Sequence, residues 1–544
     1  MRLPRILPKL ALLPFAVAVP LGCSGEDSAN QEDDFTSAEA TLLTFEFDAE
    51  LVTTDTWNLE RQAEDQMLYT IGHLNGNRSV GRLDTMKVTD LVSTRQDDGT
   101  TVVKYHVVLP VAWGSKTNLP TSYELTLPKH IDSAGLTAFT EKYSHSCIDH
   151  GAHDVDSGSM WYYYRPHTSG CQLAPEDVIT TTAKVTVSDE NTSGKYPEYD
   201  KVWEDGALKV IAIFGKYEDG ATSASDAGIS AFNRFVGEVG KVLGAGTVTT
   251  PAELPKNPGV TTPDIAFTQT MEDGRKVEVV ALLVDNVSTA GAKFNARYEP
   301  LSGHADVIFY NGHAGLGQNV RALQQKGEFF AGVYQIFFMN GCDTFAYVDG
   351  SLAEARAVLN PDDPTGTKYM DMVTNAMPSF FTSMPYASMA MINGLLSRDD
   401  PKTYEEIFAN IDDSEVVLVT GEEDNVFSPG TDPSDLWKGM TEAGSVARGE
   451  SVSFSAGKLQ PGEYVVTVAH DPENPGGDVD LYVALGKVAS LKTYDFRPYL
   501  DGSNEKVSFK LEKATEVSLM LNAYENGDAA ESYFVMSAAQ TAQP

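Results

Sequence analysis

Cysteine, basic residues and long apolar runs are all scarce in this sequence. Its 544 residues hold 4 cysteines and 40 Lys and Arg against 77 Asp and Glu, a formal charge of −37. Such an excess of acid disfavours nucleic acid and anionic lipid surfaces as partners. After the N-terminus, the sequence has no apolar run long enough to span a bilayer. The length exceeds one ordinary core, so we expect two to four domains.

The N-terminus has the pattern of an export signal. Three basic residues precede a short apolar core at residues 10–22, and Cys23 follows. This pattern resembles a bacterial lipoprotein signal, which implies removal of residues 1–22 and a lipid on Cys23. A plain secretory signal cleaved nearby is the alternative. Either way we expect an exported protein, on the outer membrane or cell surface or secreted, with residues 23–40 as an acidic tether.

The remaining cysteines divide into a pair and a single thiol. Cys147 and Cys171 lie 24 positions apart, and in an oxidising compartment this spacing favours a disulfide. Cys342 is then left over, and an unpaired cysteine in an exported protein suggests a reactive thiol.

The segment around the cysteine pair is also rich in possible metal ligands. It contains His145, His150, His153, His167, Asp149 and Asp154. Zinc is therefore conceivable, but the spacing fits no closed zinc-finger pattern. We favour the disulfide over a metal site.

Changes in hydrophobic rhythm divide the chain into three regions. Residues 41–204 alternate β-branched and aromatic residues with turns and predict a β-rich N-terminal domain. In residues 205–440, near-continuous apolar runs alternate with helical patterns, which predicts an α/β domain with a mainly parallel sheet. Residues 441–544 form short strands at regular spacing and predict a β-sandwich. The expected fold class is thus a multidomain chain with an α/β domain between two β-rich ones.

Several elements of the middle region can be placed. The predicted strands are 207–215, 277–285, 305–310, 333–339 and 415–421. The predicted helical stretches are 228–244, 319–330 and 380–411.

Two of these strands end in the same way. "VIFYNGHAG" reaches His313 through Asn-Gly, and "QIFFMNGCDT" reaches Cys342 through Asn-Gly. If the two strands are parallel neighbours, both side chains leave the sheet at its carboxyl edge, where ligands bind in open α/β sheets. An imidazole beside a thiol can take its proton and activate it as a nucleophile.

These motifs resemble the caspase-like cysteine peptidases, the group of gingipains, legumains, clostripain and caspases. The resemblance implies Cys342 as nucleophile and His313 as general acid/base, 29 positions apart. Backbone N–H groups of Ala314, Gly315 and Gly341 are the candidate oxyanion donors. The family has glycine after the histidine; Ala314 keeps the N–H, but its Cβ restricts the backbone wherever a positive φ is needed.

Acidic residues near the end of two strands are candidates for recognising a basic residue at the cleaved bond. These are Asp343, directly after the cysteine, and Asp424, in the acidic run that begins at Glu422. Solvated loop acids are the alternative for each of them.

The C-terminal region carries a second resemblance, to the bacterial pre-peptidase C-terminal domain. Its motif residues are Gly477, Asp478, Asp480, Leu481, Tyr482, Tyr494, Asp495, Arg497, Pro498, Tyr499, Gly502 and Glu505. The resemblance implies a small β-sandwich attached to an exported peptidase, and some members bind calcium. Asp478 and Asp480 are thus possible calcium ligands. A salt bridge from Arg497 to Asp480 or Asp495 is the favoured alternative.

Two functions remain open at this stage. The first is an exported cysteine endopeptidase that needs no cofactor, acts on peptides or proteins, and meets the membrane only through its lipid. The second is a catalytically inert surface binding or adhesion lipoprotein with the same fold. Residues 41–204 could serve as a pro-domain, an inhibitor or a recognition module.

Overall fold

The computed structural model describes residues 34–542, except 153, 349, 422–424, 426, 430–436, 438, 472–476, 499–501 and 525–529, and it leaves out the side chains of 541 and 542. The predicted signal, Cys23, His153, Tyr499 and Asp424 lie outside the described residues. Residues 34–40, at the end of the predicted tether, are buried or half-buried. Among them, Thr36–Ser37 form strand β1.

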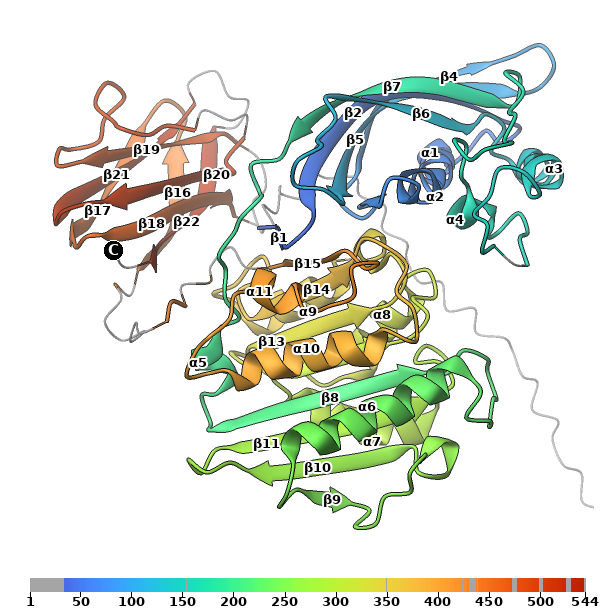
Figure 1. Ribbon diagram of the computed structural model, residues 1–544. Coiled ribbons are helices and arrows are strands. Elements are labelled where there is room, and N and C mark those ends of the chain that lie inside the picture. Colours follow the sequence, from blue (N-terminus) through green and yellow to red (C-terminus); the bar gives the residue numbers. More distant parts are fainter. Residues whose placement is uncertain are drawn as a thin grey trace, which may run out of the picture. The chain divides into compact units, whose positions relative to one another are not determined.

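The N-terminal region is built on an antiparallel six-stranded sheet (Figure 1), in the order β3-β5-β2-β7-β6 with β4 on β5. Its strands are β2 (Thr41–Thr53), β3 (Ser79–Gly81), β4 (Lys87–Arg95), β5 (Thr101–Trp113), β6 (Ser122–Pro128) and β7 (Val178–Val187). Its helices are α1 (Leu59–Met67), α2 (Tyr69–Asn75), α3 (Ser133–Tyr143) and α4 (Met160–Tyr163). The predicted disulfide between Cys147 and Cys171 is present in this region.

The middle region contains a nine-stranded mixed sheet in the order β1-β15-β14-β13-β12-β8-β11-β10-β9. Its further strands are β8 (Ala207–Gly215), β9 (Val248–Thr250), β10 (Asp264–Thr270), β11 (Lys276–Val284), β12 (Val307–Asn311), β13 (Gln335–Asn340), β14 (Met370–Asn375) and β15 (Val417–Thr420). The run from β11 through β8, β12 and β13 to β14 is parallel, and β15 pairs antiparallel with β14.

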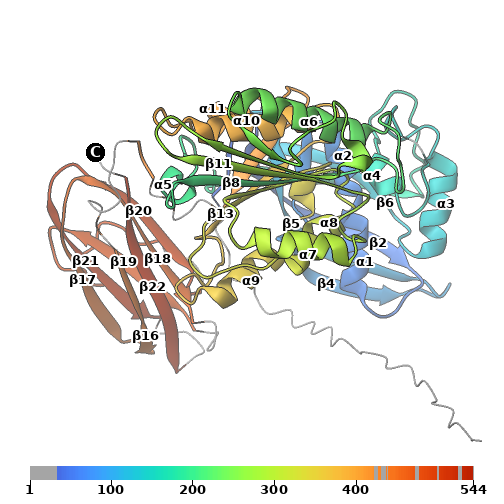
Figure 2. The same ribbon diagram turned by 90° about the horizontal axis from the view of Figure 1, so that it is seen from below.

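Helices cover both faces of this sheet, as the edge-on view in Figure 2 shows. The helices are α5 (Tyr199–Val202), α6 (Ala227–Leu243), α7 (Ala292–Ser302), α8 (Gln318–Lys326), α9 (Ser351–Leu359), α10 (Met384–Leu396) and α11 (Tyr404–Phe408), with 3-10 turns at Gly259–Thr261 and Thr344–Ala346. Buried side chains of α6 and α10 share one core cluster with one face of β8. Those of α7, α8 and α9 share another with the opposite face.

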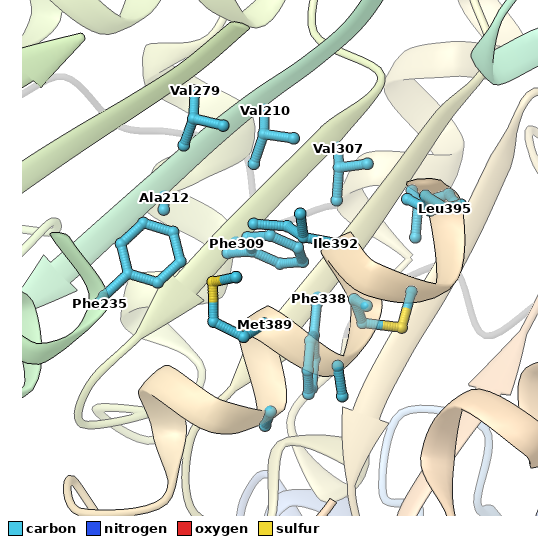
Figure 3. Packing of buried hydrophobic residues seen from close by; sticks show 14 of the residues in the cluster. Val210, Ala212, Phe235, Val279, Val307, Phe309, Phe338, Met389, Ile392 and Leu395 are labelled. Carbon is cyan, nitrogen blue, oxygen red and sulfur yellow. The ribbon is translucent and has the colours of Figure 1, made fainter. Parts of the chain in front are cut away.

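The alternation within each buried strand explains these two layers. In β8, Val210, Ala212 and Phe214 belong to the first cluster, while Ile211 and Ile213 belong to the second. On the first face, Phe309 of β12 and Phe338 of β13 lie beside α10 residues such as Met389 and Ile392 (Figure 3).

The single helical stretch predicted at 380–411 is two helices. A segment that contains Pro401 separates α10 from α11, and Pro has no N–H to continue a helix. Thr403 then starts α11 with a capping box, since its side chain accepts from the Glu406 N–H and Glu406 bonds back.

The C-terminal region forms two antiparallel sheets around one apolar cluster. One sheet holds β16 (Met440–Ala447), β22 (Glu531–Ala542), β18 (Gly462–His470) and β20 (Glu505–Leu511); the other holds β17 (Ser451–Leu459), β21 (Thr515–Ala523) and β19 (Val479–Leu485). Val479, Leu481 and Val483 of β19 point into this core, as their alternation requires.

Candidate active site

The strands that precede the histidine and the cysteine are parallel neighbours in matched register. Asn311, the last residue of β12, pairs with Asn340, the last residue of β13. His313 lies two residues after Asn311, and Cys342 lies two residues after Asn340. Both therefore leave the sheet at the same edge and at matched positions. The Gly312 N–H also donates to the Asn340 carbonyl at 3.3 Å, which ties the start of the two loops together.

Glycine is required where these loops pass each other. A Cβ on Gly341 would lie 2.8 Å from the Gly312 carbonyl oxygen and 3.3 Å from the Ala314 nitrogen. A Cβ on Gly312 would lie 2.9 Å from the Tyr310 hydroxyl. The Asn-Gly exit of each strand thus allows an approach that side chains would block.

A chain of buried amides stabilises the same edge. Asn340 donates to Asn311 at 2.9 Å, and Asn375, at the end of β14, donates to Asn340 at 3.0 Å. Ser379 and Ser388 add hydroxyl donors to Asn340 and Asn311. Sequence reasoning missed this network, although asparagine ends all three strands. It fixes the bases of the histidine and cysteine loops relative to each other.

The His313 ring is exposed but held on several sides. Its Nε2 lies 3.1 Å from the Tyr217 carbonyl oxygen, and its ring centroid lies 5.4 Å from that of Tyr217 and 5.1 Å from that of Phe381. Because a carbonyl only accepts, Nε2 carries the proton of this bond, and the neutral ring keeps an acceptor at Nδ1. The loop itself is anchored by the His313 carbonyl, which accepts from Tyr310 and Asn319.

The Cys342 thiol is in a more closed environment. The residue is half-buried, and its Sγ donates to the Ser379 carbonyl at 3.5 Å. Tyr162 of α4, in the N-terminal region, hydrogen-bonds to the same sulfur. Burial and, after it, the charge of Asp343 raise the pKa of the Cys342 thiol to about 11, against the lowering effect of the Tyr162 hydroxyl.

The predicted oxyanion donors differ in availability. The Gly341 N–H already donates to the Met339 carbonyl at 3.0 Å. The N–H groups of Ala314 and Gly315 have no acceptor among the described residues. Gly315 has a φ of 60°, whereas Ala314 has no positive φ, so its Cβ introduces no backbone strain.

Asp343 is fully buried and turned toward the N-terminal region. Its carboxyl accepts from the Asn75 side chain of α2 at 2.9 Å. Burial raises the pKa of this carboxyl to about 7. A buried, amide-bonded carboxyl does not offer its charge to solvent, so the geometry gives no sign of the specificity role predicted for it.

A second buried acid, Glu415, was not singled out from the sequence. It lies directly before the last apolar run of the region, is 2% exposed, and accepts from the Ser383 hydroxyl. Burial raises the pKa of its carboxyl to about 7. Its charge adds a small rise to the pKa of the Cys342 thiol.

The predicted metal and membrane features can be compared with the described residues. In that part of the chain, no group of three or more His, Cys, Asp or Glu side chains is placed to hold a metal ion. Arg497 bonds to Asp480 at 2.9 Å, the salt bridge favoured over a calcium site at Asp478 and Asp480. No helix among the described residues is long and apolar enough to cross a membrane.

Comparison with known proteins gives weak similarities. No family model matches the chain. The solved structures with similarity include PliG, a periplasmic inhibitor of g-type lysozyme from Aeromonas hydrophila, with 11% identity and a TM-score of 0.15 over 21% of this chain and 90% of that one. Another is vEP C-ter 100, with 22% identity and a TM-score of 0.15 over 22% and 99%.

The dimeric latent form of PorU from Porphyromonas gingivalis is also similar. The identity is 13% and the TM-score 0.10, over 24% of this chain and 16% of that one. At these TM-scores the similarities carry no argument about fold or function.

Proposed function

We propose that this protein is an exported cysteine endopeptidase with a caspase-like α/β domain and a pre-peptidase-type β-sandwich. In this proposal residues 1–22 direct export, and the mature chain is anchored through Cys23 or secreted. The observation that carries it is the register of β12 and β13, because it brings His313 and Cys342 out at one sheet edge in matched positions.

The proposed reaction uses the His313 ring in two protonation states. Nδ1 takes the proton of the Cys342 thiol as the sulfur attacks the peptide carbonyl carbon, and the carbonyl oxygen becomes an oxyanion near the free N–H groups of Ala314 and Gly315. The imidazolium then gives its proton to the leaving amine as the C–N bond breaks. Water, deprotonated by the same ring, cleaves the thioester and restores the thiol.

The raised pKa of the thiol decides which form of this mechanism applies. With its pKa raised to about 11, the thiol is protonated at pH 7. The described conformation is thus far from a resting thiolate–imidazolium pair. We propose that the proton moves during attack, with His313 as general base, once the peptide has displaced the contacts around the sulfur.

Cleavage of peptide libraries by the wild type and by Cys342→Ala tests this proposal. We expect the wild type to cleave and the variant to lose about 10³-fold or more in kcat/KM, since the nucleophile is absent. Circular dichroism of both proteins is the control for folding, and the disulfide between Cys147 and Cys171 is unchanged in the variant. Equal turnover by both proteins would remove the proposal.

The closed environment of the thiol favours a second candidate, an inert surface binding or adhesion lipoprotein. Alkylation with iodoacetamide and with a peptide chloromethyl ketone separates the two. An inert thiol reacts only at high pH or after denaturation, with a rate that rises about tenfold per pH unit toward pH 11. A catalytic thiol is also protonated at rest, but it reacts with a peptide chloromethyl ketone in the native protein at neutral pH, and His313→Ala slows this reaction because the ring takes the proton during attack.

A further inference from the structure

The loop residues around His313 are unusually apolar for an exposed surface. Three large hydrophobic side chains are exposed on the loops that follow β8, β12 and β14: Tyr217 at 39%, Leu316 at 52% and Phe380 at 55%. Tyr386, at 45%, lies in the first turn of α10, which follows the β14 loop. All of these loops leave the carboxyl edge of the sheet, the edge that carries His313 and Cys342. Exposed apolar side chains mark a binding site where they form a patch, and Tyr217 is in ring contact with Phe381, with centroids 5.7 Å apart.

The segment Ser379–Phe381 connects this surface to both candidate catalytic residues. The Ser379 carbonyl accepts from the Cys342 sulfur, and the Phe381 ring lies 5.1 Å from the His313 ring. Phe380 lies between these two contacts in the sequence and is more than half exposed. Phe380 is thus an exposed aromatic residue in the segment that contacts both the sulfur and the His313 ring.

A hollow lies beside Tyr217, whose ring contacts the His313 ring. It has a volume of about 600 Å³ and is lined by Tyr217 and the loop up to Ala227. Tyr217 contacts both His313 and Phe381, with ring centroids 5.4 and 5.7 Å away, so it joins the hollow to the aromatic surface. This volume lies within the range of about 300–1,000 Å³ for ligand pockets.

Several acids near the site are already hydrogen-bonded, whereas Asp219 and Asp154 are exposed. Asp343 and Glu415 are buried and bonded to Asn75 and Ser383. Asp226 in the hollow accepts from the backbone N–H groups of Tyr217, Glu218 and Ile229. Glu218 also lines the hollow and is exposed. A basic side chain of the substrate, bound in the hollow beside Glu218, is therefore the alternative to an apolar one.

We infer that Phe380, with Tyr217 and Phe381, forms an aromatic rim that selects peptides with a large apolar residue, such as Phe or Leu, beside the cleaved bond. This inference rests on the proposed peptidase function and assigns its substrate class. Aromatic and aliphatic side chains lose water on contact with these rings, whereas Lys or Asp would lose hydration without a partner on the rim.

The test uses fluorogenic peptides of one length that differ only in the residue before the cleaved bond: Phe, Leu, Ala, Lys or Asp. We expect kcat/KM for Phe and Leu to exceed that for Ala, Lys and Asp by about tenfold or more. Phe380→Ala should lower the preference for Phe over Ala by about fivefold, and Phe380→Leu should restore much of it. Phe330→Ala is the matched control, since Phe330 is an exposed phenylalanine before β13, at the opposite end of the strand from Cys342.

Two outcomes would overturn the inference while the peptidase function stands. One is cleavage after Lys that Glu218→Gln abolishes. The other is an unchanged ratio of kcat/KM for the Phe peptide to that for the Ala peptide in Phe380→Ala.

Binding of the intact peptides to Cys342→Ala, measured by fluorescence anisotropy, separates the inference from the function. If no peptide is cleaved but the Phe peptide binds more tightly than the Ala and Lys peptides, and Phe380→Ala removes this difference, the rim stands and the peptidase proposal fails. If the peptides bind equally, the rim fails as well.

Discussion

The loops that follow β12 and β13 start alike and end in opposite environments. Both leave through Asn-Gly at matched register, and both are tied to the same asparagine network. Yet His313 is exposed and held at its sides by rings, whereas Cys342 is half-buried beneath Tyr162 and beside Asp343. The difference shows that strand register places the two candidate residues, while the surrounding segments set the ionisation of the thiol.

The largest effect is expected at the exposed member of the pair. His313→Ala should lower kcat/KM for the best peptide by about 10³-fold, because the thiol loses its proton acceptor. His304→Ala is a matched control, since His304 is also exposed but precedes β12. Comparable losses in both variants would mean that the histidine loop has no special role.

The buried acid beside the thiol should make stability depend on pH. The pKa of Asp343 in the folded protein is about 7, above its usual value of 3.8. The contribution of the protonated carboxyl to the free energy of unfolding is therefore fully present below about pH 4. This contribution is lost as the pH rises through 7, because the folded state must then bury the charged form. Asp343→Asn should remove this slope and gain on the order of 2–4 kcal/mol relative to wild type between pH 4 and pH 8.

Urea unfolding at several pH values measures this change. Glu415→Gln should remove a further part of the slope, because the folded pKa of Glu415 is also about 7. Asp399→Asn, at a carboxyl that is 87% exposed, is the control. A parallel pH profile for Asp343→Asn and wild type would contradict the buried setting of this acid.

A methyl group between the two loops should separate them. Gly341→Ala places a Cβ 2.8 Å from a backbone oxygen that has little freedom to move, and we expect a loss of about 1–3 kcal/mol in the free energy of unfolding. Gly291→Ala is the matched control, because a Cβ there has no neighbour within 4 Å among the described residues. Equal stabilities in a urea titration would show that the loops do not meet as described.

The smallest effect concerns the hydroxyl above the sulfur. Tyr162→Phe keeps the ring and removes only the hydrogen bond that lowers the pKa of the Cys342 thiol, so that pKa should rise. Iodoacetamide alkylation at pH 8 should slow by about threefold. Tyr123→Phe, whose hydroxyl bonds elsewhere, should leave the rate unchanged. Faster alkylation in Tyr162→Phe would mean that the hydroxyl shields the sulfur rather than stabilising its charge.

Much of the α/β region could be predicted from local pattern. The apolar runs at 207–215, 305–310 and 333–339 closely match β8, β12 and β13, because a strand buried on both faces must be apolar throughout. The disulfide was predicted from the expected export and the cysteine count, and the structure contains it. The division between α10 and α11 was missed, although Pro401 marks it.

The surroundings of the thiol could not be predicted in this way. Tyr162 and Asn75 lie 180 and 267 positions before Cys342 in the sequence, and no local periodicity links them to it. The amide network across β12, β13 and β14 depends on strand order, which composition does not reveal. Asp343 followed the cysteine in a pattern that suggested an exposed acid, and the structure places it in the interior.

By itself, the sequence determined the buried strands and the residues that leave them, because apolar runs and glycines constrain the backbone wherever they occur. Only the tertiary structure decided that β12 and β13 are neighbours in matched register, and that distant segments cover one side chain in part and leave the other in solvent. Ionisation depends on how far water is excluded, and water is excluded by contacts among residues far apart in the chain.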